Sequence, residues 1–508
     1  MNAPDLMDLK LVVPEMMLTG AALVLILLAR RIRKANVVAA GTVVAAVAAA
    51  LAAAPIGWVF SGVAATGFSD MIIVDGYSQF FKVLIAAALA LTVLLSVKRA
   101  PGVVDRATDP DAPGPSADGE TGVVNTGPGN DTEDVRPAEY HALLLLASTG
   151  MMFAVSALDL LTLYLGLELM TLCSYILVGI TVNSSASNEA AIKYFLLGSF
   201  ASALLLYGIS LTYGVTGATG FEAIASAVSG DGAGTDRMIW VAMGLLGAGL
   251  AFKVAAFPFH AWAPDAYQGA TAPVAAFLAA ASKAAGLAAL GRVCLVAFEG
   301  QSGVLSMGLA GLAGLSIVVG SIMAVSQSDM KRLLAYSSIA HAGYALLGLV
   351  SGTPAGATAT MTYAFLYVFM TLGAFGVVIA LGERGEKLDG YHGLAAQRPG
   401  TAALMLLFLL SLTGIPPTAG FAAKFIVILS AVRSGHFALA VLAVLCSVVT
   451  AFVYLRVVVL MYMKEPREAA PSRFPVAVGT ALALSALVTI IAGIFPDLLA
   501  PWAVAPGK

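Results

Sequence analysis

The sequence predicts an all-α integral membrane protein with about fourteen transmembrane helices. Of its 508 residues, 59% are hydrophobic and only 11% are charged, whereas about 25% of residues are charged in an average soluble domain. A hydrocarbon core about 30 Å thick needs roughly 20 apolar residues per spanning helix, and such stretches recur along the whole chain. The spans are expected to start near residues 12, 37, 77, 139, 159, 190, 238, 272, 304, 333, 358, 401, 436 and 475.

The loops between these spans predict the orientation of the chain, because cytoplasmic loops carry an excess of lysine and arginine. One set of loops carries sixteen basic residues, and the other carries only Lys10, Arg237, Arg433 and Lys508. We therefore assign the first set to the cytoplasm and both termini to the opposite side. Seven further basic residues lie inside the spans.

Composition divides the chain into five segments. Residues 1–98 hold three leading spans, and residues 99–138 are rich in Pro, Gly, Asp and Thr without apolar periodicity. This second segment is predicted to be an acidic, disordered cytoplasmic linker. Residues 139–300 and 301–464 are expected to hold five spans each, and residues 465–508 the last one.

The seventh and twelfth spans are predicted to be broken. The seventh contains Pro258, and the twelfth contains Pro416 and Pro417. Proline lacks a backbone donor and clashes with the preceding turn, so each break frees backbone groups that protein or water must satisfy. Since the breaks are five spans apart, helices 4–8 and 9–13 are predicted to form two inverted five-helix repeats. The simpler alternative is a pair of proline kinks.

Charged residues inside the spans point to function, because a charge at the bilayer centre costs at least about 2.5 kcal/mol. Glu168 lies near the middle of the fifth span, and Lys193, Lys253 and Lys283 lie in the sixth, seventh and eighth. Desolvation lowers the pKa of a buried lysine toward values at which the ammonium can release its proton. The alternatives are a static ion pair at Glu168 and a Lys193 side chain that reaches the interface.

Two histidines and one further lysine extend this set. His260 lies in the seventh span, His341 in the tenth and Lys424 in the twelfth. Imidazole titrates near neutral pH and can pass a proton between its nitrogens, although a lone buried histidine is more often a hydrogen-bonded core residue. The full pattern of one acid, four lysines and two histidines predicts a proton relay across the membrane plane.

Other polar features are assigned no chemistry. Lys82, Arg292 and Arg456 lie within about two turns of their span ends, so their side chains are predicted to reach the interface. The three cysteines stand singly in apolar helices, which argues against a disulfide framework, a zinc site or an iron–sulfur cluster. No glycine-rich phosphate loop follows a strand pattern.

Four segments resemble the antiporter-like membrane subunits of respiratory complex I, the proton-pumping NADH:quinone oxidoreductase. They read LGLELMTLCSYIL, AFKVAAFPFHAWAPDAYQGATAPVAAFLAAASKAAG, SDMKRLLAYSSIAHAGY and SLTGIPPTAGFAAKF. The resemblance covers roughly residues 139–460. Within this family the chain is most similar to the N-type subunit, because Lys424 stands where the M-type subunit is expected to have Glu and the lateral helix of the L-type subunit is not seen. The acidic segment 99–138 departs from the family pattern.

The resemblance implies that redox energy from partner subunits drives proton transfer through this chain in the bacterial inner membrane. The relay residues that it implies are Glu168, Lys193, Lys253, His260, Lys283, His341 and Lys424. It also implies that FMN, the iron–sulfur clusters and the quinone site belong to partner subunits, with no cofactor or metal on this chain. The expected partners are other membrane subunits of the complex, including neighbouring antiporter-like subunits.

Three other functions remain open from the sequence. A subunit of a multi-subunit sodium/proton antiporter would share these helices and lysines. A structural membrane subunit would use its charges only to hold helices together, but four buried lysines face one clear acid, Glu168. A stand-alone solute transporter would need a substrate pocket, for which the sequence has no signature.

Overall fold

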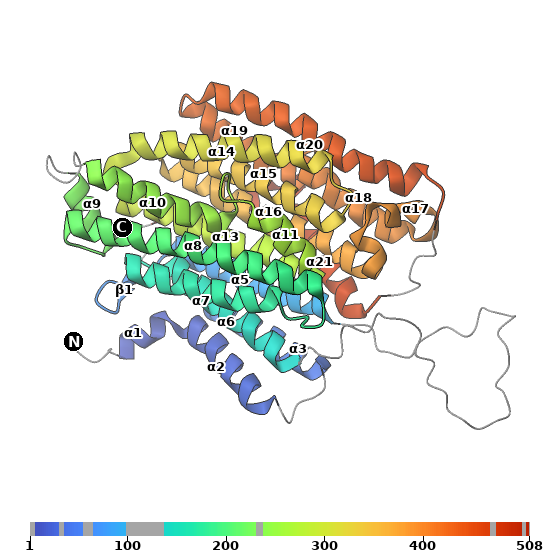
Figure 1. The fold of residues 1–508 in the computed structure, drawn as a ribbon, viewed down its shortest axis with the longest axis horizontal. Helices are drawn as coiled ribbons and strands as arrows, with labels where there is room; N and C mark the ends of the chain where they lie inside the picture. The colour runs from blue at the N-terminus through green and yellow to red at the C-terminus, as the bar shows by residue number, and fades with distance from the viewer. Residues whose placement is uncertain are drawn as a thin grey trace, which may run out of the picture.

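The computed structural model describes residues 6–29, 35–53, 64–97, 137–229, 237–467, 474–499 and 504–506. Among these residues, twelve helices are long and apolar enough to cross a membrane, and two shorter apolar helices are present as well. The helices lie side by side in one bundle, with the N-terminal helices along one edge (Figure 1). The predicted all-α membrane fold is confirmed.

The described residues of the N-terminal part form four helices and a small hairpin. The helices are α1 (Leu6–Leu11), α2 (Val13–Leu28), α3 (Ala35–Ala53) and α5 (Gly76–Ser96), and strands β1 (Ala65–Gly67) and β2 (Ile72–Val74) form the hairpin. The two strands pair antiparallel, with Ala65 opposite Val74. Asp75 then starts α5 with a capping box, in which its carboxylate accepts a hydrogen bond from the Ser78 amide at 2.8 Å.

The middle of the chain contains the fourth to eighth spans. These are α6 (Pro137–Ser156), α7 (Leu160–Val178), α8 (Ser185–Thr216) with the short α9 (Phe221–Val228), α10 (Arg237–Val254) with α11 (Trp262–Gly269), and the composite of α12 (Ala272–Phe277), η2 (Leu278–Ser282), α13 (Lys283–Arg292) and η3 (Val293–Ala297). Both η2 and η3 are π-helical. The apolar centre of this composite eighth span is completely buried.

The rest of the chain contains six further spans. They are α14 (Ser302–Val325), α15 (Met330–Val350), α16 (Pro354–Leu381), α18 (Pro399–Thr413) with α19 (Ala419–Arg433), α20 (Phe437–Met463) and α21 (Val476–Ile494). Four short elements lie before or between these spans: η4 (Glu299–Gln301), η5 (Gly382–Glu386), η6 (Leu388–Tyr391) and α17 (Leu394–Gln397). A fifth, η7 (Pro496–Leu499), follows the last span. Every predicted span start lies within five residues of a helix start. The predicted linker lies outside the described residues up to residue 136.

Both predicted breaks are present, and hydrogen bonds satisfy part of the backbone that they free. In the seventh span, the indole N–H of Trp262 donates to the Phe252 carbonyl at 3.0 Å, and the Phe257 amide donates to Ser316 Oγ at 2.8 Å. In the twelfth span, the Gly420 amide donates to Ser411 Oγ at 3.0 Å. The breaks therefore sit where other helices supply polar partners, as lipid-embedded backbone requires.

The two predicted repeats share a joint at their second helix. Asp159 caps α7 and forms an isolated β-bridge to Gly220, just as Asp329 caps α15 and forms one to Lys387. In both cases the bridge connects the start of the second helix to the loop that follows the third. This parallel supports the division into repeats 139–300 and 301–464, which stays a prediction.

Burial separates an interior from a lipid-facing surface. The most exposed spans include α8 and α20, whereas the apolar centre of α15 is completely buried. Two charged or titratable groups of the sequence analysis, Lys283 and His341, therefore lie on the two most enclosed spans. The three cysteines, Cys173, Cys294 and Cys446, are buried and free.

Candidate functional site

The site begins with an ion pair between α7 and α10. Lys253 Nζ lies 3.3 Å from Glu168 Oε1 and donates to Thr171 Oγ1 at 2.6 Å. The Lys253 side chain is 2% exposed, and that of Glu168 is 19% exposed. Ser202 on α8 also donates to Glu168 Oε1. Glu168 is thus held by one cation and one hydroxyl at the edge of the bundle, while its lysine partner lies inside.

Thr171 is placed to accept a hydrogen bond from Lys253 rather than to donate one. Its hydroxyl hydrogen is used on the Leu167 carbonyl one turn earlier in α7. The lone pairs of Oγ1 are therefore left for the ammonium. Because residues three and four apart lie on one helical face, Glu168 and Thr171 present a carboxylate and a hydroxyl side by side.

The next charge is Lys283, which directly follows the π-helical turn η2 in the buried eighth span. Single π-turns within α-helices often occur at functional positions. Lys283 Nζ donates to the Ser338 carbonyl of α15 at 2.6 Å and contacts the Ser338 hydroxyl. No carboxylate within the described part of the chain forms an ion pair with it, and its hydrogen-bond partners are neutral.

A glycine brings the lysines of the seventh and eighth spans close together. Gly286 follows Lys283 by three residues, on the same face of α13. A Cβ at Gly286 would lie 2.9 Å from Val254 Cγ1 and 3.3 Å from the Lys253 carbonyl carbon. Only a residue without a side chain therefore allows α13 to approach α10 this closely at the level of the lysines.

Aromatic side chains connect Lys283 to His341. The ammonium of Lys283 lies 6.0 Å from the centroid of the Tyr367 ring, and the His341 ring lies 5.1 Å from the same ring. His341 Nδ1 also shares a 2.6 Å hydrogen bond with the Tyr363 hydroxyl. Tyr363 and Tyr367 are one turn apart on α16, so one face of this helix borders both the lysine and the histidine.

Lys424 ends the series at the break of the twelfth span. Its Nζ donates to the freed Thr413 carbonyl at 2.8 Å and lies 3.5 Å from Ser447 Oγ. It also lies 4.6 Å from the centroid of the Tyr344 ring, which is 6.1 Å from the His341 ring. Gly414 adopts φ +88°, and a Cβ there would lie 2.9 Å from Lys424 Cδ, so glycine leaves room for the lysine stem.

We call this arrangement the mid-membrane row, and it consists of Glu168, Lys253, Lys283, His341 and Lys424. Its members come from α7, α10, α13, α15 and α19, so the row crosses the helix axes from one side of the bundle to the other (Figure 1). Serine, threonine and tyrosine hydroxyls lie between the charges. Hydroxyls both donate and accept, so together with water they can carry protons between neighbouring amines and carboxylates.

Lys193 is not part of the mid-membrane row. Its side chain is 46% exposed, and its Nζ lies 2.7 Å from Glu189 Oε1 and 3.1 Å from Asp265 Oδ2. Asp265 follows the break of the seventh span and also accepts from Arg332 at 2.7 Å. Lys193 therefore belongs to a charged cluster at the end of the bundle where α8 and α15 begin.

His260 lies inside the break of the seventh span. Its ring is 5.3 Å from that of Phe257, and its Nδ1 is buried without a hydrogen-bond partner in the part of the chain that the structure describes. An unsatisfied buried ring nitrogen is open to water or a proton, as a relay position requires. It forms no hydrogen bond with Lys253.

The interfacial assignment of Lys82 and Arg292 was wrong. Lys82 Nζ lies 2.8 Å from Glu15 Oε1 with both side chains 0% exposed, and Arg292 is paired with Asp75 at 2.8 Å and 3.0 Å with 1% of its side chain exposed. Each basic residue finds an acid outside its own helix, which the sequence alone did not indicate. By contrast, Arg456 donates to the Val325 and Gln327 carbonyls where α14 ends.

The sequence analysis missed the neutral residues that hold the row. Thr171, Ser202, Ser338 and the tyrosines Tyr344, Tyr363 and Tyr367 were not singled out. A usable signal existed, because Ser338, His341 and Tyr344 recur every three residues and thus share one face of α15. Within the described residues, no group of three or more His, Cys, Asp or Glu side chains is placed to hold a metal ion.

Comparisons with known proteins identify relatives of this chain. Residues 157–450 match the family described as NADH:quinone oxidoreductase/Mrp antiporter, TM. NADH-quinone oxidoreductase subunit N 2 of Rhizobium meliloti is 41% identical over 490 residues, covering 95% of this chain and 94% of that protein. NADH-quinone oxidoreductase subunit N of Desulfovibrio desulfuricans is 41% identical, with coverage of 98% and 97%.

Solved structures show the same fold. A chain of respiratory complex I from Thermus thermophilus superposes with a TM-score of 0.79 at 32% identity, covering 97% of this chain and 100% of that one. A chain of the Mrp complex from Dietzia sp. gives a TM-score of 0.81 at 23% identity, covering 97% and 96%. At that lower identity the second likeness concerns the fold alone.

Proposed function

Because this chain belongs to the NADH:quinone oxidoreductase/Mrp antiporter family of membrane subunits, and within it to the N subunits of NADH-quinone oxidoreductase, we propose that it moves protons through the mid-membrane row. Redox chemistry in partner subunits supplies the driving energy. FMN, the iron–sulfur clusters and the quinone site belong to those partners, and this chain performs no redox step. Its neighbours are other membrane subunits, including antiporter-like ones.

The observation that carries the proposal is the way the two inner lysines are held. Lys283 and Lys424 bond to backbone carbonyls and hydroxyls, not to carboxylates. A carboxylate partner would fix a lysine in its charged form, whereas neutral partners leave the ammonium free to lose its proton. Both lysines therefore suit a role in which each is charged and neutral in turn.

The ion pair at one end gives the row a natural trigger. While Glu168 faces Lys253, the carboxylate stabilises the ammonium. If the carboxylate moves away or takes up a proton, Lys253 loses that stabilisation and passes its proton toward Lys283, whose backbone is kept close by Gly286. The proton then continues past Tyr367 and His341 to Lys424. Lys193 and His260 act as accessory groups near the entrance of the row.

The orientation supports exchange with both aqueous sides. We assign both termini to the non-cytoplasmic side, and Val504 packs against Gly76 at the start of α5, close to the hairpin that contacts α1. The cluster of Lys193, Asp265 and Arg332 lies at the opposite end, where the basic loops are. Protons therefore enter from the cytoplasmic cluster and leave at the end that holds the termini.

The test compares variants of the assembled complex in proteoliposomes. Lys283→Met and Glu168→Gln should lower the proton-to-electron ratio or reduce coupled turnover about tenfold, which corresponds to about 1.4 kcal/mol. Lys464→Met, which removes an exposed lysine at the end of α20, is the matched control and should change neither quantity. Normal pumping and turnover in both row variants would refute the relay.

The family also contains Mrp antiporters, so sodium/proton exchange is the second candidate. Among the described residues the row offers five groups, of which only Glu168 is a carboxylate, whereas sodium is a hard cation that prefers oxygen ligands. Proton transfer is therefore favoured. Sodium-dependent proton release by the purified assembly without NADH would reverse this choice.

A further inference from the structure

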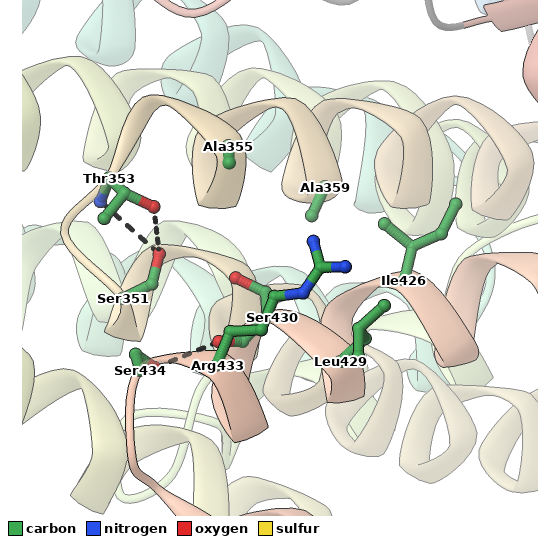
Figure 2. A pocket seen from close by; sticks show the side chains of 9 residues that line it. All are labelled: Ser351, Thr353, Ala355, Ala359, Ile426, Leu429, Ser430, Arg433 and Ser434. Carbon is green, nitrogen blue, oxygen red and sulfur yellow. Dashed lines mark hydrogen bonds between the residues drawn. The ribbon is translucent and has the colours of Figure 1, made fainter.

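A small cavity opens between the start of α16 and the end of α19, away from the mid-membrane row. Its volume is about 180 Å³, which is room for more than one water molecule. Figure 2 shows the residues that line it: Ser351, Thr353, Ala355, Ala359, Ile426, Leu429, Ser430, Arg433 and Ser434. One wall is thus apolar, the mouth carries hydroxyls, and the only charged lining residue is an arginine.

Arg433 is the last residue of α19, and its side chain points back into the cavity. Its guanidinium extends away from Ser434 toward Ala359 and Ile426 (Figure 2). It forms no ion pair with any residue that the structure describes, and no hydrogen bond links its side chain to them. The residue as a whole is exposed, but its side chain lies along the apolar wall of the cavity, and no anion of the described residues pairs with it.

The length of α16 places the cavity at the level of lipid headgroups. This helix has 28 residues, which at 1.5 Å per residue extend about 42 Å. A bilayer including its headgroup layers is about 40–45 Å thick. Thr353, which caps the helix, and the neighbouring Arg433 therefore lie in the layer that contains the lipid phosphates, while Ala359 and Ile426 lie deeper, beside the acyl chains.

The chemistry of the lining matches a phosphate. The planar guanidinium pairs with phosphate oxygens through two parallel hydrogen bonds. The hydroxyls of Ser351 and Thr353 stand at the mouth, where the positive end of the α16 dipole also favours an anion. Arg433 is moreover one of only four basic residues in the loops on its side of the membrane, so few other cations there compete for an anionic headgroup.

We propose that this cavity binds the phosphate of a net-anionic phospholipid, whose acyl chain lies along Ala355, Ala359, Ile426 and Leu429. The site is separate from the proton relay and does not depend on it. An unpaired arginine favours an anionic lipid over a zwitterionic one, because the headgroup of the latter brings its own cation. The lipid stabilises the packing of α16 on α19 at a place where no anion of the described residues does so.

The experiment uses the assembled complex in phosphatidylcholine nanodiscs that contain a small share of photoreactive lipid. One set carries phosphatidylglycerol with a diazirine on its acyl chain, and the other carries phosphatidylcholine with the same group. After irradiation, labelling of the peptides that contain residues 351–359 and 426–434 is quantified for the native complex and for Arg433→Gln, Arg433→Lys and Arg237→Gln. Arg237 is an exposed arginine at the same end of the bundle that does not line the cavity. NADH:quinone turnover verifies assembly of each variant.

We expect the phosphatidylglycerol probe to label these peptides, Arg433→Gln to reduce labelling about tenfold, and Arg237→Gln to leave it unchanged. Arg433→Lys should give an intermediate value, because lysine keeps the charge but cannot form the two parallel hydrogen bonds. Equal labelling by both probes, or undiminished labelling in Arg433→Gln, would overturn the proposal, because any lipid would then cover the surface. Displacement of the probe by inorganic phosphate in the buffer would assign the site to a free anion and would also overturn it.

Discussion

The cations packed beside α5 and the two inner lysines of the repeats bury their charges in opposite ways. Between α2 and α5, Lys82 faces Glu15 in a pair that is wholly enclosed, and Arg292 and Asp75 form a second enclosed pair beside the start of α5. In the repeats, Lys283 and Lys424 are equally enclosed but contact hydroxyls and backbone carbonyls. All four cations are buried, so burial does not distinguish them, whereas the nature of their partners does.

This difference separates structural charges from working ones. A buried cation beside a carboxylate is fixed in its charged form, and breaking such a pair leaves an uncompensated charge. A buried lysine with neutral partners pays no such penalty when it loses its proton. The two enclosed pairs beside α5 therefore fix packing, whereas Lys283 and Lys424 serve transfer, and Lys253 joins them once Glu168 moves away or takes up a proton.

The largest expected effect comes from breaking the first pair. Lys82→Met removes the cation that lies 2.8 Å from the fully buried Glu15, which should destabilise the fold by about 3–5 kcal/mol. The measurement is the amount of assembled complex and its thermal midpoint in detergent. The double variant Glu15→Leu/Lys82→Met should recover most of the loss, since both charges are then gone.

The comparison also requires that the double variant still pumps protons at the native ratio once it is assembled. A low proton-to-electron ratio in the assembled double variant would place Glu15 and Lys82 in the transfer path, and the distinction between structural and working charges would fail.

The second largest effect should come from Gly286→Ala. A Cβ there would lie within 3.0 Å of Val254 and press on the backbone of Lys253, and such overpacking typically costs about 1–3 kcal/mol. Widening the contact between α10 and α13 should also slow transfer between their lysines. The control is Gly244→Ala on an exposed face of α10, where a Cβ meets nothing within 4 Å. Equal pumping rates in both variants would show that the close approach does not matter.

The smallest effect is expected for Tyr363→Phe. This change removes one 2.6 Å hydrogen bond to His341 Nδ1 without changing the shape of the side chain, so about 0.5–1.5 kcal/mol is lost. We expect the pumping rate to fall severalfold and the thermal midpoint to stay within about one degree of the native value. A larger fall in stability than in rate would assign this histidine to the structural class.

The fold could be predicted from the sequence because the length of an apolar segment is a strong local signal of a transmembrane helix. Spans such as α12 and α14 start within two residues of their predicted positions. The breaks were also predictable, since proline and glycine act on the backbone wherever they stand. The π-turn before Lys283 left no such trace in an alanine-rich segment, and it depends on packing that only the folded bundle provides.

The site was predictable in its charges but not in their partners. Glu168 and Lys253 were both identified, yet nothing in the sequence indicated that Ser202 or Thr171 would contact them. The error on Lys82 and Arg292 has the same cause. The distance of a basic residue from its span end does not reveal such a pair. Glu15 is 67 positions from Lys82, and Asp75 is 217 positions from Arg292. A local sequence pattern does not show pairing over such separations.

The direction of the mid-membrane row has a consequence for the membrane voltage. Because the row crosses the helix axes, hops from Lys253 to Lys424 run parallel to the membrane surface and do no work against the transmembrane potential. Only the steps that bring a proton in from one side and release it on the other cross the field, at about 2.3 kcal/mol per charge for 100 mV. The membrane potential therefore opposes only the entry and exit steps of the path. Hops within the row do not depend on it.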